Sequence, residues 1–124
     1  MIDAILRLSQ DRVYAYVIDL ALWQYNATGD RDQVDDVLIR NLDRMFDLYD
    51  RAIGSGMRRG SRDHRIAVRA LKAAIEATSM VVQSRSRVAP FIERFNPILS
   101  ESGMSPEDVA YRSYRSVSFG QGRQ

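Results

Sequence analysis

The sequence "GSGMRRGSRDHR", residues 54–65, separates two segments in which apolar residues recur at helical spacing. Gly54 and Gly56 are typical of a helix end, and Ser61 is a good N-cap for a new helix. The apolar face before the turn consists of Val34, Leu38, Leu42, Met45, Tyr49 and Ala52. The stripe after it consists of the small residues Ala67, Ala70, Ala74 and Ala77, which permit close helix approach. We therefore expect residues 30–85 to form an antiparallel helical hairpin that bends near Met57.

A further helix is predicted before this hairpin, because apolar residues recur at helical spacing from residue 2 to residue 25. Gly29 is a plausible stop for it, and Asp30 a plausible N-cap for the helix that follows. Its main face consists of Ile2, Leu6, Val13, Tyr16, Val17, Leu20 and Trp23, widened by Ile5, Tyr14, Ala21 and Leu22. A helix so broadly apolar belongs either at the centre of a bundle or in a subunit interface.

Two shorter helices are predicted toward the C-terminus. Pro90 and Pro97 bracket one helical piece, and the sequence "SPED", residues 105–108, is a strong helix start. No strand-like alternation lasts long enough to build a sheet. We predict an all-α fold, a compact helical bundle with three long helices and one or two short C-terminal helices. Residues 1–119 would form one domain, and residues 120–124 a flexible tail.

The composition fits one globular domain rather than a disordered or fibrous chain. The chain has 124 residues, of which 45% are hydrophobic and 27% charged, with a net charge of +2. It has no cysteine, which excludes disulfides and thiolate metal sites. The N-terminal residues do not resemble a secretory signal, and the longest apolar run is too short to span a membrane. We expect a cytoplasmic protein that does not bind membranes.

The basic turn itself has two interpretations. A helix N-terminus has unpaired N–H groups and a partial positive charge, so a serine cap among arginines could hold a phosphate or a carboxylate. Arginine in the first turn has the wrong sign for the helix dipole, which favours such a ligand. The residues expected to contact an anion, a nucleic acid or a partner are Arg58, Arg59, Ser61, Arg62, Arg65, Arg69 and Lys72, with Arg112 and Arg115 from the C-terminal segment.

The favoured interpretation neutralises these charges inside the hairpin. Residues whose numbers sum to about 114 would lie opposite each other, since both helices rise equally per residue. The expected pairs are Asp50 with Arg62 or Arg65, Asp47 with Arg65 or Arg69, and Asp43 with Arg69 or Lys72. Arg58 and Arg59 stay unpaired in this scheme.

Catalytic and metal-binding chemistry is disfavoured. Asp43, Asp47 and Asp50 share one helical face, but neighbouring arginines would compete with a metal ion for their oxygens. His64 is expected to be a surface or capping residue, because no nucleophile lies within its reach in sequence. No common catalytic or phosphate-binding motif is present. We therefore expect no enzyme, no cofactor and no metal site.

The interpretation that remains is a helical module that binds another macromolecule. We expect a protein-interaction module, such as an adaptor, a chaperone or a small subunit, that binds another protein or itself. The candidate interface residues are Tyr16, Trp23, Phe91 and Phe95. The alternative is a nucleic-acid accessory protein that contacts phosphates through the basic turn. The stretch "YRSYRSVSF", residues 111–119, is interpreted as the docking face of the last helix rather than a base-stacking surface.

Overall fold

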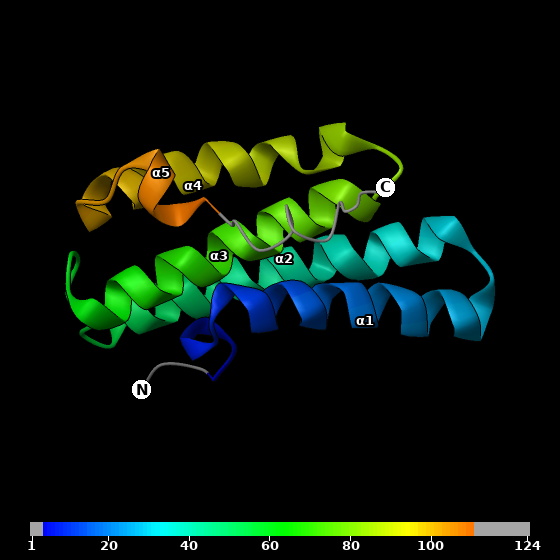
Figure 1. Ribbon diagram of the computed structural model, residues 1–124, viewed down its shortest axis with the longest axis horizontal. Coiled ribbons are helices and arrows are strands. Elements are labelled where there is room, and N and C mark those ends of the chain that lie inside the picture. Colours follow the sequence, from blue (N-terminus) through cyan, green and yellow to red (C-terminus); the bar gives the residue numbers. More distant parts are fainter. Residues whose placement is uncertain (1–3, 111–124) are drawn as a thin grey trace, which may run out of the picture.

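A computed structural model describes residues 4–110 of the chain (Figure 1). Within these residues the chain forms helices and no strand, which confirms the predicted all-α bundle. The elements are η1 (Ala4–Arg7), α1 (Gln10–Thr28), α2 (Arg31–Gly54), α3 (Arg62–Val81), η2 (Arg85–Arg87), α4 (Ala89–Ser102) and α5 (Pro106–Val109). Helices α2 and α3 form the antiparallel hairpin that the turn predicts. Helix α4 packs on the opposite side of α3 from α1 (Figure 1).

Helix α3 is the centre of the bundle, and it contacts α1, α2, α4, α5 and η1. Its alanines have no exposed surface, so neighbouring helices can approach its backbone closely. They are Ala67, Ala70, Ala73, Ala74 and Ala77. The broad apolar face of the first helix predicted either a central position in the bundle or a subunit interface. The first of these two alternatives is wrong. Helix α1 is peripheral and buries only Val13, Val17 and Ala21.

The first apolar segment is not one continuous helix. Residues 4–7 form a separate 3-10 turn that buries Ile5 and Leu6 in the core. Ser9 then starts α1, because its side chain accepts a hydrogen bond from the backbone N–H of Arg12. A serine among apolar residues was the local signal for this break, since an N-cap serine satisfies an otherwise unpaired backbone donor.

The predicted stop of α1 and the predicted N-caps of α2 and α3 are confirmed. Gly29 ends α1 in the left-handed conformation with a φ of 66°, which favours glycine. The Asp30 side chain accepts hydrogen bonds from the N–H groups of Asp32 and Gln33, and that of Ser61 accepts one from His64. Asp30 thus caps the start of α2 at the end of the hairpin far from the turn, and Ser61 caps the start of α3 at the turn.

The far end of the hairpin is closed by polar side chains. The buried Asp35 carboxylate accepts the backbone N–H of Gln83 at 3.0 Å, and the Arg31 guanidinium donates to the carbonyl of Val81 at 3.0 Å. The start of α2 thus satisfies backbone groups at the end of α3, where the helix itself provides no partners.

Helix α4 is longer than the predicted segment between the two prolines. It runs through Pro97, which lacks the N–H that would bond to the carbonyl of Glu93. Both residues are exposed, so water can satisfy that carbonyl. Phe91 and Phe95 are only 9% and 4% exposed and belong to the core, so their assignment as interface residues is wrong. The ring of Phe91 packs 5.6 Å from that of Phe46.

Helix α5 starts as predicted, with Ser105 and Asp108 forming a reciprocal capping box and Pro106 in the first turn. It ends at Val109, whose carbonyl accepts a hydrogen bond from the Gln10 side chain at 2.6 Å. The predictions for residues 111–119, for Arg112 and Arg115, and for the tail at 120–124 lie outside the described residues.

Candidate interaction surfaces

Part of the positive charge of the basic turn is neutralised by α4, a partner that the sequence does not indicate. Arg59 pairs with Glu101 of α4 at 2.9 Å, and Lys72 pairs with Glu76 of its own helix at 3.7 Å. Arg58, Arg62 and Arg65 are exposed, and the structure gives them no ion pair within residues 4–110. These three remain as candidate anion-binding cations near the turn.

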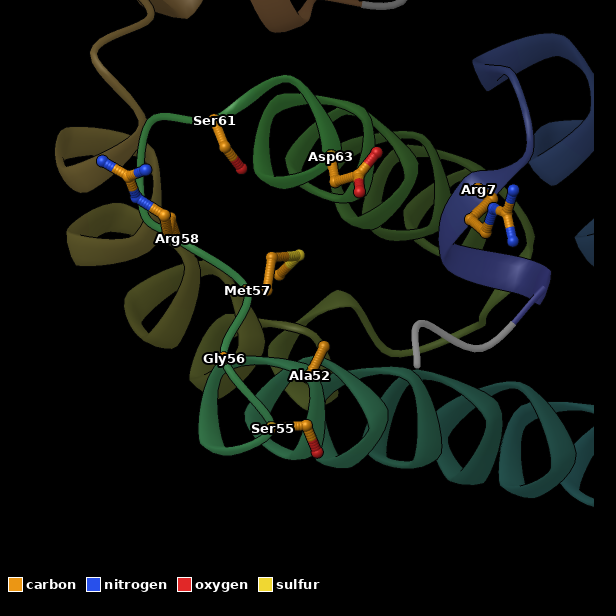
Figure 2. A pocket seen from close by; sticks show the side chains of 8 residues that line it. All are labelled: Arg7, Ala52, Ser55, Gly56, Met57, Arg58, Ser61 and Asp63. Atoms are coloured by element: carbon orange, nitrogen blue, oxygen red, sulfur yellow. The ribbon is translucent and has the colours of Figure 1, made fainter.

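A cleft of about 490 Å³ lies beside this turn (Figure 2). It is lined by Arg7, Ala52, Ser55, Gly56, Met57, Arg58, Ser61 and Asp63. Figure 2 shows Asp63 on the side that faces Arg7 of η1, whereas the side chain of Arg58 points away from Met57. The carboxylate of Asp63 would oppose an anion here, so the cleft is a mixed-charge surface rather than a phosphate cradle.

The acidic edge of α2 does not pair with α3, so the predicted ion pairs are wrong. Asp47 and Asp50 instead pair with Arg94 of α4, at 3.7 and 2.6 Å. The Arg94 guanidinium also lies 5.0 Å from the centre of the Phe46 ring, a cation–π contact. The hairpin register was correct, but it does not specify how α2 is rotated about its axis. That rotation turns the aspartates toward α4.

Along this edge, as elsewhere in residues 4–110, no group of three histidine or acidic side chains lies close enough to hold a metal ion. Arg94 occupies oxygens of both Asp47 and Asp50. Helix α2 therefore presents a mixed-charge surface in which one arginine links two carboxylates.

His64 is buried, so its predicted position on the surface is wrong, but its side chain does bind a backbone N–H at the start of α3, directly before the N-cap Ser61. The backbone N–H of Gly60 donates to its Nδ1 at 2.9 Å, and its Nε2 lies 2.7 Å from the hydroxyl of Tyr49. Because Nδ1 accepts, the ring proton is on Nε2 and is donated to Tyr49. The sequence did contain a signal: His64 continues the alanine stripe by one turn, and the hairpin register places it opposite the Tyr49–Asp50 end of α2.

This pair is held in its neutral form. Burial lowers the pKa of His64, and the nearby Arg59 lowers it further. Burial also raises the pKa of the Tyr49 hydroxyl to about 12, and the nearby Glu101 adds to that rise. A neutral, enclosed imidazole with both nitrogens bonded inside the protein joins α2 to α3, and it is not placed to exchange protons with a substrate.

Most of the large apolar side chains that are exposed within residues 4–110 lie on α1. Trp23 is 74% exposed, Leu22 56% and Tyr16 39%, which places both predicted residues of this helix on the surface. They lie with charged neighbours on the side of the helix away from its buried valines. We call this surface the α1 outer face, and its residues are Arg12, Ala15, Tyr16, Asp19, Leu22, Trp23 and Asn26.

A second apolar surface lies between α3 and α4, where Met80 is 58% and Ile92 45% exposed. Both line an open groove of about 410 Å³ together with Lys72 and Glu76. The Tyr14 hydroxyl of α1 donates a hydrogen bond to the sulfur of Met80, which lines the groove. This groove is bordered by charged side chains, and no aromatic ring is among the described residues that line it.

No protein-family model, curated protein or solved structure matches this chain. Within residues 4–110, none of the helices combines the length and the apolar character needed to cross a bilayer.

Proposed function

We propose that this protein is a non-enzymatic interaction module and that the α1 outer face is its binding surface. The observation that supports this proposal is the 74% exposure of Trp23 beside the half-exposed Leu22. Exposed apolar clusters rimmed by polar residues mark protein-binding sites, and tryptophan is among the residues that contribute most to binding energy. The free protein would hold this surface ready for a partner that buries it.

The burial pattern of α1 supports the same proposal. A broadly apolar helix has two uses, in the centre of a bundle or in an interface between chains. Helix α3 occupies the centre here, so only the second use explains why α1 is apolar on its outer side as well. An adaptor or a small subunit of a larger assembly would use the surface in this way.

Site-specific photo-crosslinking in the native host tests the proposal. A photoreactive phenylalanine analogue would replace either Trp23 or, as a control, the exposed Arg44 of α2. We expect discrete covalent adducts from position 23 that do not form from position 44. Adding Leu22→Asp to the position-23 variant should abolish these adducts. The same adduct pattern from both positions would show that the α1 outer face is not a binding surface.

A second candidate function is phosphate contact through the turn, in a nucleic-acid accessory protein. Its support is the group of exposed cations Arg58, Arg62 and Arg65, for which the structure gives no ion pair within residues 4–110. Phosphate contacts weaken steeply as salt rises, because binding releases condensed counterions. Arg59 belongs to its ion pair with Glu101 and is left out of the binding set.

A gel shift at two salt concentrations separates the two functions. Arg58→Ala with Arg62→Ala would be compared with Arg40→Ala and Arg44→Ala, which remove the same charge from α2. Phosphate contact predicts weaker binding for the first variant alone, with a salt slope lowered by about one for each phosphate that this variant no longer neutralises. Equal binding by the two variants would exclude the turn as a nucleic-acid site.

A further inference from the structure

The α1 outer face carries both a cation and a carboxylate, so two copies of this face can be complementary in charge. Arg12, Tyr16, Asp19 and Trp23 follow one another at intervals of four, three and four residues, so they form one ridge along the helix. The ridge rises about 16 Å from its first residue to its last. It carries a cation at one end, an aromatic ring and a carboxylate in the middle, and an indole at the other end.

Arg12 and Asp19 cannot satisfy each other within one chain. They are seven residues apart, about 10 Å along the axis. The structure gives neither side chain an ion pair within residues 4–110. Both are exposed next to large apolar side chains, where an interface would remove them from water. A partner that covers this surface would therefore have to offer a carboxylate to Arg12 and a cation to Asp19.

A second copy of the chain meets this demand if the two α1 helices pack antiparallel about a two-fold axis near Tyr16. Arg12 then faces the level of residue 20 on the other copy, between Asp19 and Trp23 on the same ridge. Its guanidinium can pair with that carboxylate and lie against that indole, as arginine does at tryptophan faces. The symmetry repeats both contacts, and the two Tyr16 rings meet at the axis.

We infer that the partner of the α1 outer face is a second copy of this chain, paired antiparallel through Arg12, Tyr16, Asp19 and Trp23. This inference rests on the proposed function, because it uses the same surface and specifies its occupant. Helix α1 is 19 residues long, about 28 Å, and its N-cap and C-cap lie outside the ridge. The pairing needs no change in the bundle beneath it.

Charge reversal with mixing of the two single variants tests the pairing. Arg12→Asp alone and Asp19→Arg alone each place like charges opposite one another at two positions in the homodimer. Each should weaken self-association by roughly tenfold or more, measured as the dimer dissociation constant by sedimentation equilibrium. Both residues are exposed, so circular dichroism and denaturation of the dilute variants should match the unmodified protein.

Restoring self-association by combining the two charge reversals is the result that only the antiparallel pairing predicts. An equimolar mixture of the two single variants should form a mixed dimer, and the chain carrying both changes should dimerise on its own. Dimers that ignore the single reversals, or single variants that fail to combine, would overturn the antiparallel pairing. An unmodified protein that stays monomeric at all concentrations would exclude the second copy as the partner. Adducts to other proteins from position 23 would then still support the interaction function.

Discussion

Helices α1 and α2 both pack against α3, yet they present different chemistry to the solvent. Every exposed residue of α2 (Arg31–Gly54) is polar or charged, apart from the terminal glycine. Helix α1 exposes Leu22 and Trp23 instead. The bundle needs one apolar face from each helix, and α2 shows that a polar outer face is sufficient for the fold. This difference is the reason for our proposal that the apolar outer side of α1 serves an interaction rather than folding.

The same substitution on the two helices tests this difference most strongly. Leu42→Ala removes a fully buried side chain of α2 and should lower the free energy of unfolding by about 2 to 5 kcal/mol. Leu22→Ala on α1 should change it by less than about 0.5 kcal/mol, since that leucine is 56% exposed. Urea denaturation of dilute protein measures both. Similar losses from the two changes would mean that the α1 outer face is part of the folded core.

A pH dependence should belong to the contact between α2 and α3, because the buried side chains of α1 are all apolar. The pKa of His64 is lower in the folded state than its ordinary value of 6.5. As the pH falls below about 6.5, the unfolded chain takes up a proton that the folded protein does not. Stability should be full above that pH and fall below it, by at most about 1.4 kcal/mol per pH unit.

Thermal denaturation between pH 7.5 and pH 5 measures this loss. The control is His64→Gln, which cannot titrate, and its melting temperature should vary less over the same range even if it starts lower. A slope that is equally steep in the variant would assign the pH dependence to other groups and would contradict a neutral, buried His64.

The outer charges of the two helices should also differ in their contribution to stability. Arg94→Ala removes two half-exposed ion pairs to α2 and a cation–π contact with Phe46, which together stabilise the fold by about 1 kcal/mol. Arg12→Ala on α1 should leave the dilute protein unchanged, because its guanidinium has no ion pair within the described part of the chain. Urea denaturation of both variants at low and at high salt measures their free energies of unfolding. A loss from Arg12→Ala equal to that from Arg94→Ala would contradict the assignment of Arg12 to an interface.

Local signals made much of the fold predictable from the sequence. Gly29, Asp30, Ser61 and Ser105 each act on backbone groups within a few residues, so their roles do not depend on the distant packing. The alanine stripe of α3 likewise predicts close approach, because small side chains permit it from either neighbour.

The predictions that were wrong concern which helix packs against which. Helical periodicity identifies an apolar face but not the helix that covers it, so Phe91 and Phe95 resembled an interface although α4 turns them into the core. The turn register identified opposite levels of α2 and α3 but not the rotation that gives Asp47 and Asp50 to Arg94. His64 was misjudged because a polar side chain at a core position becomes acceptable only when specific partners surround it.

Trp23 is the only tryptophan of the chain, so its fluorescence reports the central claim directly. We predict that its emission is typical of a water-exposed indole at low protein concentration and shifts to shorter wavelength as the concentration rises. Arg12→Asp should move this transition to higher concentration. Emission that stays water-exposed across the whole concentration series, in a protein that remains folded, would contradict self-association through the α1 outer face.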